Sequence, residues 1–116
     1  MKIYVGHSRD FDFKKDLYEP LSKIDNIDFI FPHESSDKPF NSKEALKEVD
    51  LMFAEVSFPS TGLGIELGWA NLYGKHILAF YKQEEEISGS VKYIATQLVA
   101  YSSPEDLISK LQTILK

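Results

Sequence analysis

Strand-like and helix-like segments alternate along the whole chain, and this alternation restricts the fold more than any other feature. Hydrophobic periodicity predicts strands at 2–6, 27–31, 50–56, 76–81 and 97–101. It predicts helices at 13–24, 42–49, 62–73 and 88–95, and a last one from 103 onward. Strands that alternate with helices indicate a three-layer α/β fold, in which helices cover both faces of a parallel sheet. We expect a doubly wound, flavodoxin-like or Rossmann-like sheet with strand order 2-1-3-4-5, and one domain over residues 1–116.

Residue types mark several helix ends. Pro20 lies inside the first predicted helix, which should bend there. Gly74 follows the helix at 62–73 and is typical of a helix C-terminus. Ser103 and Pro104, followed by two acidic residues, are typical of a helix N-terminus.

Charge and composition narrow the classes of function. The 116 residues carry a net charge of −5, spread along the chain, which argues against binding to a nucleic acid polymer. No cysteine is present, so disulfides and Cys-type zinc sites are excluded. We expect a cytoplasmic protein without a signal peptide or a membrane partner, because no apolar run reaches about 18 residues. The three histidines lack the spacing of metal ligands. We expect neither a metal nor an organic cofactor.

Ligands of such sheets bind beyond the carboxyl ends of the strands, where the strand order reverses. Two loops should meet there, at residues 6–9 and 57–64. Gly62 and Gly64 would let a ligand approach the backbone. Ser60 and Thr61 either donate to a phosphate group or cap the following helix.

Glu66 is expected in the first turn of the helix at 62–73, where the helix dipole favours an ionised carboxylate. A carboxylate held in a crevice can attack an anomeric carbon, as retaining glycosidases do. The alternative is a surface acid that only complements the dipole. Arg9 is a candidate anion ligand or an ordinary surface residue.

The segment 54–70 resembles the signature of the nucleoside 2-deoxyribosyltransferase superfamily, and most closely its 2'-deoxynucleoside 5'-phosphate N-hydrolase branch. Residues 2–6 and 74–78 extend the resemblance over most of the chain, and residues 60–68 are its specific part. The resemblance implies that Glu66 is the nucleophile, which forms a covalent intermediate with the sugar. It also implies that Tyr4 supports this nucleophile.

The resemblance further implies a nucleoside 5'-monophosphate as substrate. Ser60 stands where transferases of free nucleosides often carry an Asp. Ser90 matches a phosphate-binding Ser that the second subunit of a homodimer supplies, with Ser88 as the alternative. The other candidate ligands of the substrate and its phosphate are Gly6, Ser8, Arg9 and Gly62.

Two departures from the family pattern concern the site. Gly6 and Arg9 are one position out of register with the family residues when Tyr4 and Ser8 are aligned. Ser42 occupies the position of the family Asp that protonates the leaving base. The departing base benefits from a general acid, and the candidates to replace that Asp are Glu34, Asp37 and Glu44.

We therefore predict an enzyme that hydrolyses or transfers the N-glycosidic bond of a nucleotide, with a deoxynucleotide expected. The alternative is a non-catalytic nucleotide-binding or signalling module. The run 6–10 is faintly similar to the start of Toll/interleukin-1 receptor domains, some of which cleave NAD with a Glu. Segment 60–68, however, does not match those domains.

Overall fold

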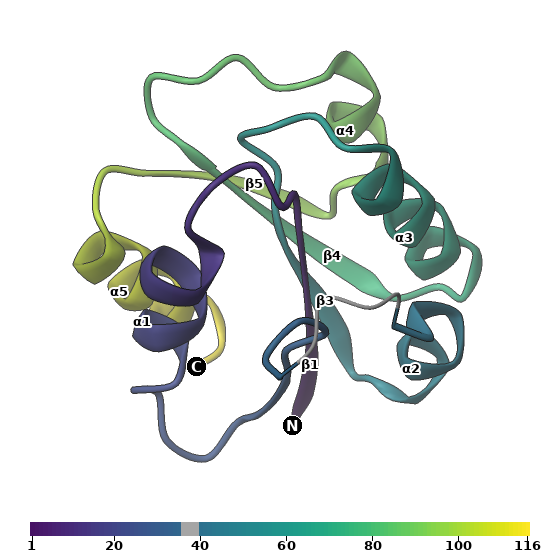
Figure 1. Ribbon diagram of the computed structural model, residues 1–116, viewed down its shortest axis with the longest axis horizontal. Coiled ribbons are helices and arrows are strands. Elements are labelled where there is room, and N and C mark those ends of the chain that lie inside the picture. The colour runs from purple at the N-terminus through teal and green to yellow at the C-terminus, as the bar shows by residue number, and fades with distance from the viewer. Residues whose placement is uncertain (36–39) are drawn as a thin grey trace.

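The computed structural model describes residues 1–35 and 40–116. Its central sheet contains the strands β1 (Lys2–His7), β2 (Asp28–Ile30), β3 (Leu51–Glu55), β4 (His76–Lys82) and β5 (Gln97–Tyr101). The strand order is β2-β1-β3-β4-β5, and every neighbouring pair is parallel (Figure 1). The predicted α/β fold and strand order are confirmed. All carboxyl ends of the strands therefore lie at one edge of the sheet.

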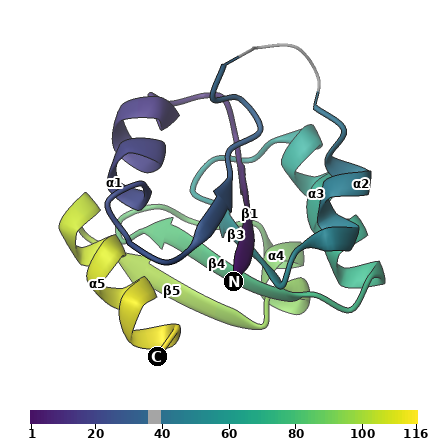
Figure 2. The same ribbon diagram turned by 90° about the horizontal axis from the view of Figure 1, so that it is seen from below.

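Helices cover both faces of the sheet (Figure 2). They are η1 (Lys14–Tyr18), α1 (Glu19–Leu21), α2 (Ser42–Glu48), α3 (Thr61–Leu72), α4 (Gly89–Ile94) and α5 (Pro104–Ile114). The elements η1, α1 and α5 lie on one face, and α2, α3 and α4 lie on the other.

The helix predicted at 13–24 differs in detail. It consists of a π-helical turn, η1, followed by the short helix α1. Pro20 lies inside α1 and has no N–H to donate to the preceding turn. The regular α-helical hydrogen bonding is therefore interrupted there.

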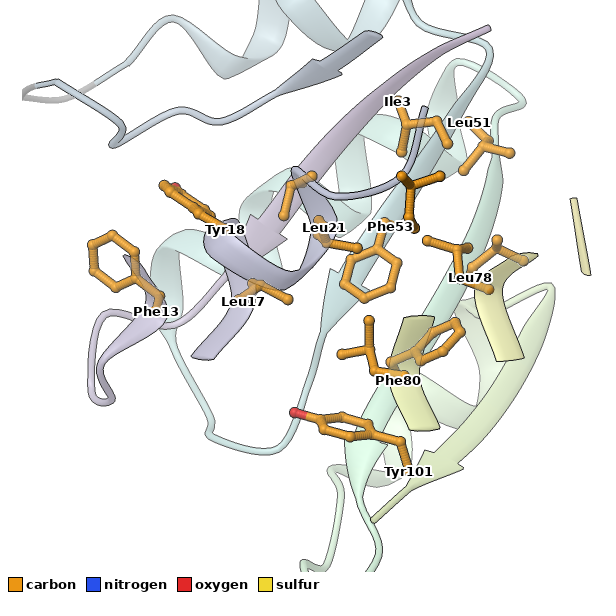
Figure 3. Packing of buried hydrophobic residues seen from close by; sticks show 14 residues of the cluster. Ile3, Phe13, Leu17, Tyr18, Leu21, Leu51, Phe53, Leu78, Phe80 and Tyr101 are labelled. Atoms are coloured by element: carbon orange, nitrogen blue, oxygen red, sulfur yellow. The ribbon is translucent and has the colours of Figure 1, made fainter. Parts of the chain in front are cut away.

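Each face of the sheet has its own hydrophobic core, because successive strand residues point to opposite sides. In β1, Ile3 and Val5 pack against η1, α1 and α5, whereas Tyr4 faces α2 and α3. Figure 3 shows the first of these clusters, in which Phe53 and Phe80 lie with ring centroids 4.8 Å apart. Both cores are continuous along the central strands, so the strand ends that carry the site are held from both faces.

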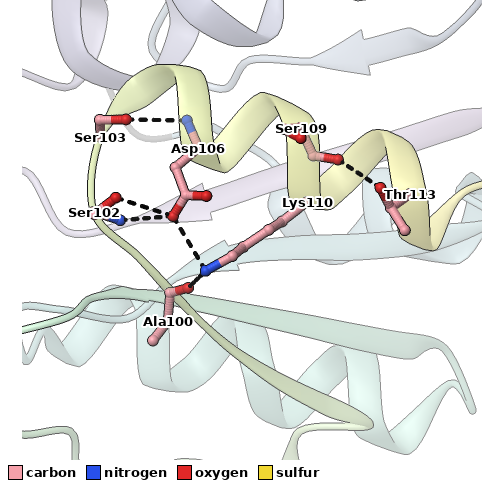
Figure 4. A network of polar contacts seen from close by, with 7 residues as sticks. All are labelled: Ala100, Ser102, Ser103, Asp106, Ser109, Lys110 and Thr113. Carbon is pink, nitrogen blue, oxygen red and sulfur yellow. Dashed lines mark hydrogen bonds and ion pairs between the residues drawn. The ribbon is translucent and has the colours of Figure 1, made fainter.

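The predicted helix ends are confirmed. The Ser103 hydroxyl accepts a hydrogen bond from the Asp106 N–H at 3.1 Å and caps α5 (Figure 4). The backbone N–H of Ser102 donates to the Asp106 carboxylate, and this bond is the main reason why the pKa of Asp106 is lowered. Gly74 follows α3 with a φ of 70°, a conformation that favours glycine.

Within residues 1–35 and 40–116, no helix is both long enough and apolar enough to cross a membrane.

Candidate active site

Glu66 of α3 forms hydrogen bonds with two hydroxyl groups from other elements. The Tyr4 hydroxyl of β1 donates to the Glu66 carboxylate, with 2.5 Å between the two oxygens. The Ser42 hydroxyl, from the first residue of α2, donates to the same carboxylate oxygen, Oε2. The two hydroxyl oxygens are themselves 2.7 Å apart. The carboxylate of α3 is thus held by two other elements, β1 and α2, which are far from it in the sequence.

The structure corrects the expected place of Glu66 in its helix. Helix α3 begins at Thr61, because the Ser60 hydroxyl accepts a hydrogen bond from the Leu63 N–H and caps the helix. Glu66 therefore lies in the second turn, and the first turn contains no acidic residue. A carboxylate placed there is held by its side-chain partners rather than by the helix terminus.

Burial decides the ionisation of Glu66. It raises the pKa of the carboxyl group above its ordinary value, and it is the largest influence. The hydrogen bonds from Ser42 and Tyr4 lower this pKa, and so does the positive charge of His33. Burial and the nearby carboxylate in turn raise the pKa of the Tyr4 hydroxyl, which stays protonated and remains a donor.

Gly6 lies beneath the carboxylate. A Cβ atom added there would lie 2.4 Å from Cε of Met52 and 3.5 Å from Oε1 of Glu66. Since both hydroxyls bind Oε2, Oε1 is the carboxylate oxygen that faces Gly6. A side chain at this position would displace the end of the Met52 side chain and crowd the carboxylate.

The serines predicted to bind phosphate line a common cavity. It has a volume of about 210 Å³ and lies between the N-terminal half of α3 and α4. Its walls include Ser60, Ser88 and Ser90 together with Phe58 and Leu67. All three serines belong to one protomer. The supply of Ser90 by a partner subunit stays a prediction.

Other predicted ligands lie in the loops around this edge. Ser8 is buried, and its hydroxyl accepts a hydrogen bond from the Asp10 N–H at 3.1 Å, so it stabilises the loop after β1. Arg9 is exposed in the same loop. Gly62 is exposed in the first turn of α3, where an added Cβ would meet only the Ser60 hydroxyl, at 4.0 Å. The backbone of this turn is therefore open to a ligand.

A chain of polar contacts joins the ends of β1 and β2. His7 Nδ1 donates to the Ser8 carbonyl oxygen at 2.7 Å, and His7 Nε2 accepts from the Tyr18 hydroxyl at 2.6 Å. The Tyr18 oxygen in turn accepts a hydrogen bond from the His33 N–H at 3.1 Å. Burial lowers the pKa of His7 to about 4, so this imidazole is neutral at physiological pH. Sequence reasoning assigned no role to His7 or His33 beyond excluding them as metal ligands.

Glu55 is a fully buried carboxylate, which sequence reasoning missed. It accepts hydrogen bonds from the Ser57 N–H at 2.7 Å, from the Ser57 hydroxyl at 3.0 Å and from the Tyr101 hydroxyl. The Ser57 hydroxyl oxygen also accepts from the Lys82 N–H. Burial raises the pKa of Glu55 in spite of these bonds. The network connects the carboxyl ends of β3, β4 and β5. The sequence indicates it only by an acidic residue at the end of an apolar strand.

The residues that are candidates to replace the general-acid Asp of the family lie in different surroundings. The Glu44 carboxylate is exposed and pairs with Lys47 at 3.3 Å. Glu34 is exposed in the turn after β2. Asp37 lies outside the described residues. Ser42, at the position of the family Asp, binds Glu66 directly.

Among curated proteins, the "Putative 2'-deoxynucleoside 5'-phosphate N-hydrolase 1" of Thermofilum pendens is 39% identical to this chain over 75 residues. The resemblance inferred from the signature is therefore confirmed. The matched segment covers 60% of this chain and 52% of that protein, so the chain spans about half the length of its curated relative. No family model matches the chain.

Solved structures confirm the fold. The CMP N-glycosidase BcmB of Clostridium botulinum superposes with a TM-score of 0.70 at 21% identity, over 97% of this chain and 99% of that one. A conserved protein from Enterococcus faecalis V583 superposes with a TM-score of 0.65 at 16% identity, over 98% of each chain. At these identities the likeness concerns the fold.

Proposed function

We propose that this protein is a nucleotide N-glycosidase that cleaves the bond between the base and the sugar of a nucleoside 5'-monophosphate. The observation that carries the proposal is the half-buried Glu66 carboxylate, held by the hydroxyls of Tyr4 and Ser42 at the carboxyl edge of the sheet. The curated relative and the CMP N-glycosidase of the same fold have names that describe this chemistry.

In the proposed reaction, Glu66 attacks C1' of the sugar as the bond to the base breaks, and a glycosyl ester forms. Water then attacks C1' and releases the sugar phosphate together with the free carboxylate. Tyr4 and Ser42 orient Oε2 of Glu66, so Oε1 is the attacking oxygen. Burial disfavours the ionised form of Glu66. The same loss of solvation makes the ionised carboxylate a stronger nucleophile.

The 5'-phosphate would bind in the cavity between α3 and α4. Ser60 and Ser90 line this cavity at the N-terminus of a helix of 12 residues, and the exposed backbone of Gly62 follows Ser60 in the first turn of that helix. Ser8 and Arg9 would contact the sugar or its phosphate from the loop after β1. We propose a deoxynucleotide as the preferred substrate, in line with the name of the curated relative.

Ser60→Asp tests the phosphate site. Asp is as good a helix cap as Ser, so α3 should remain intact, but a carboxylate facing the substrate phosphate repels it. We expect KM for deoxynucleoside 5'-monophosphates to rise by about 10- to 100-fold, with little change for free nucleosides. The measurement is base release from matched ribo- and deoxyribonucleotides and nucleosides. Ser103→Asp, at the capping position of α5, is the control and should behave as wild type.

Equal effects of Ser60→Asp on nucleotides and nucleosides would place the phosphate elsewhere. Nucleotide binding without any base release would favour a non-catalytic module instead.

We also propose that the protein forms a homodimer through the outer face of α3. Ile65 is 49% exposed and Leu72 is 76% exposed, and Trp69 lies between them. On the neighbouring helix α4, Tyr93 is 95% exposed. A helix that is apolar on all sides is normally covered. A second copy of this face would cover it.

Leu72→Glu should weaken the proposed dimer, because it places charges in an apolar interface. Sedimentation equilibrium should give twice the protomer mass of 13.3 kDa for wild type and a lower mass for the variant. Leu98→Glu, on β5, changes an exposed leucine elsewhere and should leave the dimer intact. A monomeric wild-type protein would contradict this assembly.

A further inference from the structure

The order of the strands places His33 on the side of Glu66 opposite to the phosphate cavity. Glu66 lies over β1, where it contacts Tyr4 and Gly6. The cavity lies between α3 and α4, toward β3 and β4. His33 follows β2, the neighbour of β1 on the other side. A nucleotide with its phosphate in the cavity and C1' at Glu66 therefore directs its base toward His33.

The distances across the sheet agree with the size of the ligand. Neighbouring strands are about 4.8 Å apart, so the path from β3 across β1 to β2 is about 10 Å long. A nucleoside 5'-monophosphate has about this length from phosphate to base. The cavity, the carboxylate and the imidazole thus lie in the order of the phosphate, the sugar and the base.

The position of His33 is well defined in the fold. Its backbone N–H donates to the Tyr18 hydroxyl, and its half-buried ring meets the His7 ring edge-on, with centroids 5.8 Å apart. The ring also lies close enough to Glu66 for its charge to act on that carboxylate. Among the described residues, the titratable and charged groups near it include Glu66 from α3, His7 from β1 and Tyr18 from η1, with Glu34 next to it in the chain and Arg9 in the loop after β1.

These neighbours suit a proton donor. The charge of His33 acts on the Glu66 carboxylate. His7 is neutral and uses both ring nitrogens in hydrogen bonds, so it neither repels that charge nor offers a proton. Histidine is the side chain that ordinarily changes its charge between pH 5 and 8.

On the basis of the proposed N-glycosidase function, we propose that His33 is the general acid that protonates the departing base. As the bond from C1' to the base nitrogen breaks, its electron pair stays on the base. The His33 imidazolium gives its proton to a ring nitrogen or carbonyl oxygen of the base, and C1' bonds to Glu66. In the second step, the neutral imidazole accepts a proton from the attacking water, and the Glu66 carboxylate leaves. Ser42, which binds Glu66, then acts as a positioning residue.

The test compares leaving groups that do and do not need a proton. The preferred deoxynucleoside 5'-monophosphate is paired with its ring-methylated form, 7-methylguanine for a purine or 3-methylcytosine for a pyrimidine. A methylated base is already cationic and leaves as a neutral molecule. His33→Gln should reduce kcat/KM by about 10²- to 10⁴-fold for the ordinary base and change it little for the methylated one.

Two further readouts separate chemistry from structure. Loss of the proton donor in His33→Gln should lower kcat for the ordinary base and leave KM nearly unchanged, because a general acid acts in the transition state. His76→Gln changes an exposed histidine at the opposite edge of the sheet, at the start of β4, and should match wild type with both substrates.

Equal losses with both leaving groups, or no loss with the ordinary base, would overturn the role of His33. A wild-type protein that releases neither base, or a Glu66→Gln variant that releases both at the wild-type rate, would instead overturn the proposed function. The two failures are therefore distinguishable.

Discussion

Glu66→Gln should reduce base release from nucleoside 5'-monophosphates by at least about 10³-fold, because the variant has no nucleophile to form the glycosyl ester. Glutamine keeps the size of the side chain and an oxygen that can accept from the hydroxyls of Tyr4 and Ser42. The site should therefore keep its shape and still bind the nucleotide. Base release and nucleotide affinity, measured side by side, separate these two effects.

The same substitution should make the protein more stable at neutral pH. The pKa of Glu66 is raised in the folded state, so the folded protein binds its proton more tightly than the unfolded chain does. Stability is therefore lost as the pH rises through the pKa of the folded state, and glutamine removes this loss. Below the ordinary carboxyl pKa of about 4.3 both forms are neutral, and the difference should vanish.

Urea unfolding of wild type and Glu66→Gln at pH 4 and pH 7.5 measures this difference. Glu48→Gln, which changes an exposed carboxylate of α2, is the control and should show neither the loss of activity nor the gain in stability. A Glu66→Gln variant that is less stable than wild type at pH 7.5 would contradict the conclusion that burial raises the pKa of this carboxyl group.

Glu55→Ala should destabilise the fold by about 3 kcal/mol or more. It leaves three donors without their acceptor, the N–H and hydroxyl of Ser57 and the hydroxyl of Tyr101, and each buried unsatisfied group costs about 1–3 kcal/mol. The total is a large share of the roughly 5–15 kcal/mol that stabilises a domain. The midpoint of urea unfolding measures the loss. Activity should fall as well, because Ser57 leads into the segment that ends at Ser60.

Tyr101→Phe is the milder companion variant. It removes one donor and its hydrogen bond to Glu55, and it should cost about 1 kcal/mol. Glu48→Ala, on the exposed side of α2, should change stability by less than about 0.5 kcal/mol. An unchanged midpoint in Glu55→Ala would show that this network does not hold the strand ends.

Local patterns predicted most elements of this fold to within one or two residues. The apolar runs that became β3 and β4, the capping Ser103 and the terminal Gly74 depend on residues close in sequence. The π-helical turn before Pro20 was not predicted, since the pattern of apolar residues there also fits an ordinary α-helix. The predicted start of α3 is one residue late, and the prediction of Glu66 in the first turn is wrong, because Glu66 lies beyond the first 3.6 residues from either start.

The sequence by itself determined the α/β class, the strand order and the identity of Glu66 and Tyr4 as a candidate pair. Periodicity, caps and the signature at 60–68 carry that information locally. Only the tertiary structure decided that Ser42 binds Glu66, that Glu55 is buried and that the charge of His33 acts on the Glu66 carboxylate. These contacts join residues that are far apart in the chain, and they depend on how helices pack over parallel strands. The raised pKa of Glu66 follows from the same packing, because only burial by distant elements removes a carboxylate from water.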